Sequence, residues 1–591
     1  MASVPAFHRL AAAGLPALAL ALVAGCASWP PPPKQKTPPP APPPGPTVQE
    51  QFTRASAEMF DGYMARWPTF AITLGLHQHD GTLPDLSAAG IAATVEWTRG
   101  QIAAFEALDP AQLDDTSRVE REMILAQLRG DLFDLEVARW PFRDPRFYLW
   151  FLDLSDFVTR DYAPLADRAR AIVSICKAAQ GHLETAQANL PAAMPRPWLD
   201  SALDQVRGMM QFVGEDVASA TAALEDPALL TEVSESLLAC GTALAGYRDY
   251  LQARLAEAND EFAIGADAFL RMLADKEGLE IDLTRLTDIG KRALDRDLGN
   301  LSIAARKLHP RRPIPRIIER ARRDRPRPDQ LIAEATRQTA AMRQFLADKD
   351  LVSVPSEDVA EVRVTPPFLR YNFAFLSAPG PFESRELPAF YYITPPDPRW
   401  PRKEQREYIP ARQDLLFTTI HEVWPGHFLH HLHGKKNSSR VLRAFCSYAT
   451  AEGWAHYTEQ MMLEEGVGGD DPKVAVGQLL NALMRDARFL SAIGLHTGNM
   501  TVEQSMALFM EKAYQDKATA RQQAIRGTFD PGYLNYTLGK LMILKLRDDW
   551  KAKMGEAYSL KAFHDSFLSY GCAPVPVIRR AMLGPDAGPA L

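Results

Sequence analysis

Histidines gather in one short part of this 591-residue chain. Of its 13 histidines, six lie between His421 and His456. Imidazole nitrogens and carboxylates are the ligands of catalytic zinc, which keeps one coordination position open for water or substrate. The segment begins with His421 and Glu422 after an apolar run that ends at Ile420. Zinc-protease helices of the HExxH type begin in the same way, and their glutamate activates water on the metal. The segment therefore indicates metal-assisted hydrolysis with Glu422 as the general base.

The spacing of the histidines departs from that motif. Pro425 stands where the second histidine is expected, and the next one, His427, follows His421 by six residues. On a regular helix six residues turn the chain by about 600°, which leaves the two side chains about 120° apart. Proline lacks an N–H group and clashes with the carbonyl four residues earlier, while Gly426 tolerates unusual dihedral angles. We therefore expect a looped or widened turn that brings His427 back to the face of His421.

A second expected helix carries a candidate third ligand. In TAEGWAHYTE, residues 450–459, Glu452 lies 31 residues after His421, which leaves room for a helix, a turn and an antiparallel return. His456 and Glu459 follow it by four and seven residues and share its helical face. A site of two histidines and one glutamate then consists of His421, His427 and Glu452, with Zn2+ as the metal.

Other roles for these residues stay open at this point. The histidine–glutamate pair could be chance polar residues on a helix, and Glu452 could be a surface carboxylate or a capping partner. His427 and His431, four residues apart, form a rival ligand pair. His456 either orients a ligand or is simply packed. The remaining histidines of the segment, which we expect to be solvated or to surround the ligands, are His430, His431 and His433.

The elements that must position these residues are mainly helices. Apolar residues recur at three- and four-residue spacing in long stretches, while Pro and Gly fall mostly between them. These stretches are 167–190, 200–223, 231–256 and 326–348. Two β-like runs, at 359–364 and 389–394, precede the histidines and predict a small sheet beside the zinc helix. We expect an all-α fold with two lobes around a cleft, an N-terminal helical lobe at 47–353 and a catalytic lobe at 354–591.

The N-terminus is typical of an exported, lipidated protein. An apolar run of about 15 residues is too short to span a bilayer and fits a signal peptide, residues 1–25. It ends in Val-Ala-Gly before Cys26, as in a bacterial lipobox, and Ala27 favours the outer membrane. The proline-rich segment 26–46 predicts an extended tether. We therefore expect a lipid on Cys26 and a body that faces the periplasm. The alternative is an ordinary signal peptide.

Composition excludes some classes of protein. The formal net charge of -7 is opposite to that of a basic nucleic-acid binder, so we expect no nucleic-acid partner. The cysteines after Cys26 match no metal or redox spacing. An oxidising periplasm permits a disulfide, and buried free thiols are the alternative. These cysteines are Cys176, Cys240, Cys446 and Cys572.

The paired motifs resemble a known family. HEVWPGH followed by EGWAHYTE is similar to the bacterial domain of unknown function 885, often found in lipoproteins, with the pattern HExxPGH then EGWAxYxE. Segments at 73–87, at 388–395 and after residue 484 are similar too, so the resemblance covers nearly all of the chain from about residue 50. That family is grouped with the gluzincin-like metallopeptidases. The resemblance implies a largely helical fold, zinc on His421, His427 and Glu452, and amide hydrolysis by water that Glu422 activates.

Further candidates concern the substrate. A peptidase of this mechanism needs a donor for the developing oxyanion, and Tyr536 and His496 are the candidates, with core packing as the alternative. Arg488 could bind a substrate carboxylate, although a structural salt bridge is the alternative. The strand predicted at 389–394 could pair with an extended substrate, or it could be a plain core strand.

We therefore expect an envelope-anchored zinc metallopeptidase that hydrolyses short peptides. Its partners would be the peptide substrate and, through Cys26, the membrane. A first alternative is a metal-dependent hydrolase of a non-peptide amide or ester that uses the same residues. A second is a non-catalytic scaffold lipoprotein of the envelope. Glu422 argues against the scaffold, because a purely structural metal site needs no general base.

Overall fold

The computed structural model describes residues 45–366, 369–370, 373–498 and 500–591. Residues from Thr47 to Leu591 form one compact unit. The predicted signal peptide at 1–25, the lipidation residue Cys26 and nearly all of the tether at 26–46 lie outside the described residues. The predicted lobe boundary at residue 353 stays a prediction. The largest hydrophobic core contains side chains from before and after residue 353. For example, the ring centres of Tyr63 and Phe445 are 4.9 Å apart.

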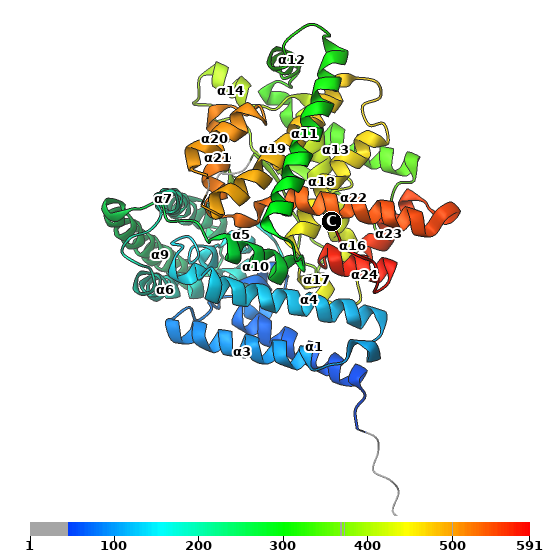
Figure 1. The fold of residues 1–591 in the computed structure, drawn as a ribbon. Helices are drawn as coiled ribbons and strands as arrows, with labels where there is room; N and C mark the ends of the chain where they lie inside the picture. The colour runs from blue at the N-terminus through cyan, green and yellow to red at the C-terminus, as the bar shows by residue number, and fades with distance from the viewer. Residues whose placement is uncertain (1–44, 367–368, 371–372, 499) are drawn as a thin grey trace, which may run out of the picture. The chain divides into compact units, whose positions relative to one another are not determined.

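The prediction of a mainly helical fold with one small sheet is confirmed. The first helix begins with a capping box, in which Thr47 and Glu50 satisfy each other's backbone N–H groups. The helices before the sheet are α1 (Val48–Arg66), α2 (Pro68–Thr73), α3 (Ala88–Glu106), α4 (Asp115–Leu132), α5 (Ser155–Thr159), α6 (Leu165–Asn189), α7 (Arg196–Gln211), α8 (Ala218–Thr221), α9 (Pro227–Arg254), α10 (Ala266–Glu277), α11 (Leu283–Leu308), α12 (Ile314–Ala321) and α13 (Leu331–Lys349). Helices α1, α3 and α4 lie side by side (Figure 1).

A second hydrophobic core lies between α6, α7 and α9 (Figure 1). Its members include Ile172, Leu203 and Leu244, which are almost fully buried. The segment Pro227–Glu257 is, among the described residues, the one helix long and apolar enough to cross a membrane by length and composition. Its apolar face packs against α6 and α7 in this core, as expected for a core helix of a globular body.

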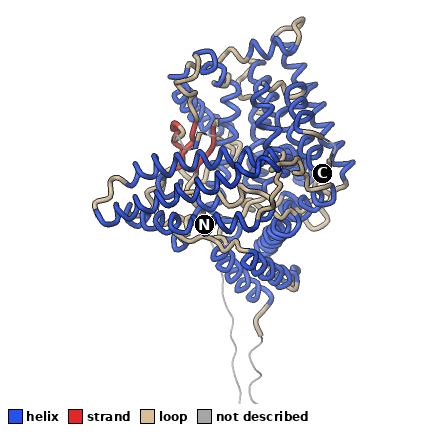
Figure 2. Tube along the Cα trace, turned by 90° about the vertical axis from the view of Figure 1, so that its left-hand side faces the viewer, coloured by secondary structure: helices blue, strands red, loops and turns tan. Residues whose placement is uncertain are grey.

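Figure 2 shows the small sheet in red among the helices. Its three strands have the order β1-β3-β2, with β1 parallel and β2 antiparallel to β3. The predicted strands at 359–364 and 389–394 are β1 and β3. Every residue of β3 is buried, and β3 is paired on both edges. It is therefore a core strand, and the hypothesis that it binds substrate at a free edge is wrong. The three strands are β1 (Ala360–Val364), β2 (Ala374–Ser377) and β3 (Ala389–Ile393).

The helices after the sheet contain the histidine segment and its surroundings. Helix α18 packs along α22 (Figure 1). Helix α15 contacts α18 and α19. The bounds are α14 (Arg402–Tyr408), α15 (Arg412–Glu422), α16 (His427–Lys436), α17 (Arg440–Ala444), α18 (Tyr448–Glu464), α19 (Pro472–His496), α20 (Val502–Glu511), α21 (Lys517–Gly527), α22 (Asn535–Met554), α23 (Leu560–Leu568) and α24 (Val575–Leu583).

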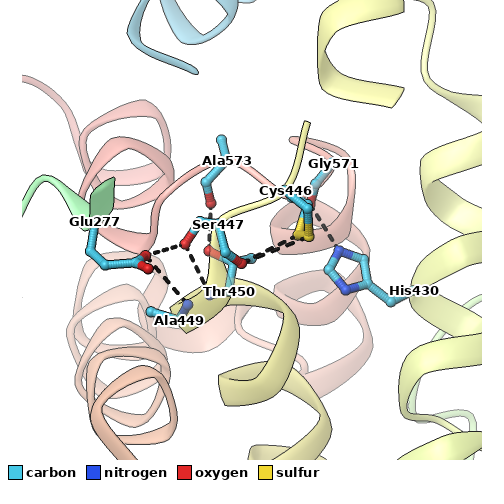
Figure 3. The surroundings of a disulfide bond; sticks show 9 residues. Glu277, His430, Cys446, Ser447, Ala449, Thr450, Gly571 and Ala573 are labelled. Atoms are coloured by element: carbon cyan, nitrogen blue, oxygen red, sulfur yellow. Dashed lines mark hydrogen bonds between the residues drawn. A yellow bond between two sulfur atoms is a disulfide. The ribbon is translucent and has the colours of Figure 1, made fainter. Parts of the chain in front are cut away.

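A disulfide ties the start of α18 to the segment before α24. It joins Cys446 to Cys572 across 126 residues of sequence, and Thr450 Oγ1 adds a hydrogen bond of 2.6 Å to the carbonyl of Ala573 (Figure 3). The buried Glu277 accepts hydrogen bonds from Ser447 Oγ and from the backbone N–H of Ala449 in the first turn of α18. A carboxylate is favourable at this helix end, where the dipole is positive. The other two described cysteines, Cys176 and Cys240, are buried and free.

Candidate metal centre

The helix that carries the first histidine stops where the sequence predicts a distortion. The apolar side chains of α15, Leu415, Phe417 and Ile420, are fully buried and anchor it. The helix ends at Glu422, residues 423–426 form a bend, and α16 begins at His427. The Trp424–Pro425 peptide bond in this bend is cis. The six-residue spacing is thus divided between two helices, and the angle calculated for one regular helix no longer applies.

The bend is held by close backbone contacts. The N–H of Gly426 donates to the carbonyl of Ile420 at 3.0 Å, six residues back. A Cβ on Gly426 would lie 1.8 Å from the carbonyl oxygen of His421, so no other residue fits without moving the backbone. The indole Nε1 of Trp454, on α18, donates to the carbonyl of Pro425 at 2.9 Å. The bend is therefore tied both to its own helix and to α18.

Two glycines let α18 and α22 approach closely. A Cβ on Gly453 would lie 2.5 Å from Cα of Gly539, and a Cβ on Gly539 would lie 1.9 Å from the carbonyl oxygen of Ala449. Gly453 is the neighbour of Glu452, and Gly539 is one turn from Tyr536. Without side chains at the crossing, the helices bring Glu452 and Tyr536 to the same place as the histidines.

The predicted ligands meet at one point. His421, His427 and Glu452 are, among the described residues, the group of possible metal ligands whose donor atoms lie within 4.8 Å of one another. Nε2 of His421 is 3.2 Å from Oε2 of Glu452, and Nε2 of His427 is 3.3 Å from the same oxygen. The two imidazole rings are nearly perpendicular, with 4.8 Å between their centres. The rival pair of His427 with His431 does not form such a group in the described part of the chain.

These residues fit zinc. Ligand atoms bound tetrahedrally at about 2.0–2.1 Å from a zinc ion lie about 3.3 Å apart, and the separations of 3.2 and 3.3 Å between the imidazole nitrogens and Oε2 of Glu452 match this value. Oε2 of Glu452 is buried and makes no hydrogen bond among the described residues. The two imidazole nitrogens face this buried oxygen without a hydrogen bond of good geometry, and a cation between the three ligands would satisfy all of them.

Two residues for which the sequence predicted no role orient the first ligand. Nδ1 of His421 donates to Oε1 of Glu459 at 2.8 Å, which leaves its Nε2 directed to Glu452. Nη2 of Arg485, on α19, lies 2.9 Å from the same Glu459 oxygen. A carboxylate behind a ligating imidazole sets its orientation and raises its basicity. The signal for Glu459 was its place two helical turns after Glu452; nothing in the sequence indicated Arg485.

Electrostatics at the centre are dominated by these carboxylates. Burial and the Arg485 guanidinium lower the pKa of His421, but Glu452 and Glu459 outweigh them and raise it to about 9. Burial opposes ionisation of Glu452, yet the two imidazoles hold its pKa well below the usual value. In the metal-free protein the ligands therefore compensate one another's charge, and metal binding would displace a proton.

Glu422 lies beside the ligands and contacts the sheet. Its Oε2 accepts a hydrogen bond of 3.0 Å from the backbone N–H of Leu376 in β2. Strand β2 is at the edge of the sheet, so this N–H is not used in pairing with β3. The carboxylate that directly follows His421 is thus held by one oxygen, and its other oxygen has no partner among the described residues.

Tyr536 and Arg488 lie next to the centre. The ring of Tyr536 is stacked on His421 with 6.2 Å between ring centres. Burial, and then the charge of Glu452, raise the pKa of Tyr536, so its hydroxyl keeps its proton at neutral pH. Cζ of Arg488 lies 4.7 Å from the centre of the Tyr536 ring.

His496 is in different surroundings. Its Nε2 lies 2.6 Å from the carbonyl oxygen of Gly527, and its ring is stacked on Phe269. It lies eleven residues after Arg485 on α19, about 16 Å along the helix axis. These contacts favour the packing alternative for His496 and leave Tyr536 as the candidate donor at the centre.

The remaining histidines of the segment have backbone partners or are packed. Nε2 of His430 lies 3.0 Å from the carbonyl of Gly571, and Nε2 of His433 lies 2.8 Å from that of Ser353. His456 is fully buried, with Nδ1 3.5 Å from Oε2 of Glu459. It therefore touches the carboxylate that orients His421 rather than the ligand group itself.

The chain is similar to known proteins over nearly all of its folded part. The family described as "Bacterial protein of unknown function (DUF885)" matches residues 68–582. No curated protein matches the chain. A solved structure from Shewanella oneidensis, of an inferred lipoprotein of unknown function, is 25% identical with a TM-score of 0.76. The similarity covers 90% of this chain and 99% of that one. An inferred lipoprotein from Colwellia psychrerythraea is 18% identical with a TM-score of 0.75, over 91% and 98% of the two chains, and shows the shared fold.

Proposed function

The chain belongs to the bacterial family DUF885, whose function is unknown, and from this premise we propose that it is a zinc-dependent hydrolase of peptide bonds. One observation carries the proposal. Two imidazole nitrogens and one carboxylate oxygen converge with the separations that zinc requires, and a second carboxylate, Glu422, directly follows the first ligand. Three protein ligands with a general base beside them are the arrangement of catalytic rather than structural zinc sites.

His421, His427 and Glu452 would hold the metal, and Glu459 would keep His421 in the orientation that ligation needs. When bound, zinc supplies a Lewis acid that polarises a carbonyl group and lowers the pKa of water toward 7. The buried surroundings of the ligands strengthen these electrostatic effects, because few water molecules screen them.

Glu422 would move the proton. The hydrogen bond from Leu376 restrains one of its oxygens and leaves the other for the attacking water. The carboxylate accepts the proton of that water and delivers it to the nitrogen of the leaving amine, so that the peptide bond breaks without a free amide anion. Tyr536, stacked on His421, would donate its hydroxyl proton in a hydrogen bond to the developing oxyanion.

The location that we propose is the bacterial envelope. The lipobox before Cys26 and the proline-rich tether support a lipid anchor, and two structurally similar proteins are inferred to be lipoproteins. A disulfide between Cys446 and Cys572 agrees with an oxidising compartment outside the cytoplasm. We propose attachment to the outer membrane with the body in the periplasm.

Metal analysis and one substitution test this function. We expect about one zinc per chain in purified protein that has not met a chelator. Glu422→Gln should retain the zinc and lose at least about 100-fold of the peptide turnover, since general-base catalysis contributes about 10²–10⁴-fold. Glu404→Gln, on the exposed α14, is the matched control and should behave as the native protein. Unchanged turnover in Glu422→Gln would refute the mechanism, and hydrolysis of esters or non-peptide amides alone would favour the first alternative.

A further inference from the structure

Arg488 is a buried cation without a carboxylate partner. It lies on α19 with 6% of its surface exposed. Its Nε donates to Oε1 of Gln523 at 2.8 Å, and within the part of the chain that the structure describes no carboxylate lies within ion-pairing distance of it. Its terminal amino groups make no hydrogen bond among the described residues. Burying an unpaired charge costs several kcal/mol in general, so a folded protein that retains one commonly has a use for it.

The neighbouring arginines are already neutralised. Arg485 pairs with Glu459 at 2.9 Å, and Arg526 pairs with Asp530 at 2.8 Å. Cζ of each of these two also lies within 6 Å of the Tyr536 ring centre, as does that of Arg488. Of the three guanidinium groups around this ring, Arg488 alone among the described residues lacks a compensating acid. The cluster therefore has one positive charge in excess, which suits one monoanion.

The distance between the Arg488 guanidinium and the metal ligands limits which anion could bind to Arg488 during the reaction. Cζ of Arg488 is 4.7 Å from the Tyr536 ring centre, and that centre is 6.2 Å from the centre of the His421 ring. The separation of guanidinium and ligand cannot exceed these two distances combined. Equivalent atoms of consecutive residues are about 3.8 Å apart, and a charge-assisted hydrogen bond adds about 2.8 Å. Within this limit the lengths allow one residue, and at most two, between the scissile carbonyl and a carboxylate bound to Arg488; the shorter substrate is the one that we consider.

We infer that Arg488 binds the free C-terminal carboxylate of a peptide substrate and that the enzyme removes one residue at a time from that end. This inference rests on the proposed function, which it narrows from peptides in general to peptides with a free C-terminus. Bidentate pairing of a guanidinium with a carboxylate sets both the position and the direction of the chain.

The reaction balances without further reactants. Water adds to the carbonyl of the last peptide bond, and the C–N bond breaks. The shortened peptide leaves with a new carboxylate, and the released amino acid takes the proton on its amine. Its own carboxylate stays on Arg488 until it dissociates, so the free amino acid is a weak competitive ligand of the same site.

The test compares carboxylate with amide. N-acetylated tripeptides that differ in the C-terminal residue, with every standard amino acid represented there, are supplied as free acids and as C-terminal amides. Their products are identified by mass spectrometry. We expect single-residue release from the acids and about 100-fold slower turnover of the amides. Arg488→Met should remove this preference, and Arg488→Lys should restore part of it. Arg521→Met, at an exposed position of α21, is the matched control and should keep the preference.

A binding measurement separates this inference from the proposed function. In zinc-loaded Glu422→Gln protein, calorimetry should show tighter binding of acids than of amides, and Arg488→Met should bind both equally. The melting temperature of Arg488→Met should be unchanged or higher, because an unpaired buried charge is removed; a large decrease would indicate a structural role and overturn the inference. Equal cleavage of amides and acids, or cleavage at internal bonds, would also overturn it while leaving the peptidase in place. A preference for peptides with acidic side chains over peptides with a free terminal carboxylate would likewise overturn the inference and leave the peptidase in place.

Discussion

Replacing Glu459 by glutamine tests whether the buried carboxylate behind His421 sets the metal affinity. Glu459 is fully buried and receives Nδ1–H of His421 at 2.8 Å and the Arg485 guanidinium at 2.9 Å. Glutamine keeps the shape and one acceptor oxygen but removes the negative charge. The hydrogen bond to Nδ1 can persist, so the imidazole keeps its orientation and loses basicity.

Two separate effects follow, with different magnitudes. Loss of a carboxylate behind a ligating histidine weakens metal binding by about 10–100-fold, or about 1.4–2.7 kcal/mol. The Arg485 guanidinium, almost fully buried, loses its charged partner. Breaking a buried pair in this way costs about 3–5 kcal/mol of folding free energy, and the remaining amide acceptor places the expectation at the lower end.

Zinc affinity is measured by competition with a chelator, and the folding free energy of the metal-free protein by urea unfolding. Glu465→Gln, at the end of the same helix, is the control and should change neither quantity. Circular dichroism first establishes that the variant is folded. A folded Glu459→Gln protein whose zinc dissociation constant lies within threefold of the native value would refute the reasoning.

Two further predictions concern packing and pH. Gly453→Ala places a Cβ 2.5 Å from Cα of Gly539, so α18 and α22 must separate. We expect this variant to lose about 1–3 kcal/mol of unfolding free energy and to have at least tenfold lower turnover. Gly434→Ala, in open space on α16, is the control and should be neutral or stabilising. Equal stability of the two variants would contradict the close crossing. Burial lowers the pKa of His564 to about 4, so this residue is neutral in the folded state and its contribution to stability, complete above pH 6.5, is lost as the pH falls toward 4. Between pH 7 and 5 the unfolding free energy of the native protein, measured in urea, should therefore fall by about 2 kcal/mol more than that of His564→Gln. Equal pH dependence of the two proteins would show that His564 is not the cause of this loss.

Much of the fold could be predicted because local patterns decide it. The stretches expected to be helical at 167–190 and 231–256 correspond to α6 and α9, whose apolar residues repeat at helical spacing. Aromatic and β-branched runs marked β1 and β3. Strand β2 was missed, because four residues without alternation carry no periodic signal and become a strand only by pairing with β3.

Some residues of the candidate site could likewise be predicted from the sequence, and others could not. His421, Glu422, His427 and the interrupting proline stand close together in the chain, so residue type and helical geometry sufficed to predict an interrupted helix that brings the two histidines together. Glu452 followed from its place on a nearby helix. Arg485 reaches Glu459 from α19, and its part in the site depends on which helices pack together. No local pattern encodes that.

The amino-acid sequence thus determined which residues are candidate metal ligands, because ligand types and their spacing act over one or two helical turns. The tertiary structure alone decided that Gly453 and Gly539 let two helices cross in contact, that Cys446 pairs with Cys572, and that Arg488 is left without an acid. These features join residues tens to more than a hundred positions apart. Their physical cause is the close packing of side chains in the core, which selects partners by shape and charge rather than by distance along the chain.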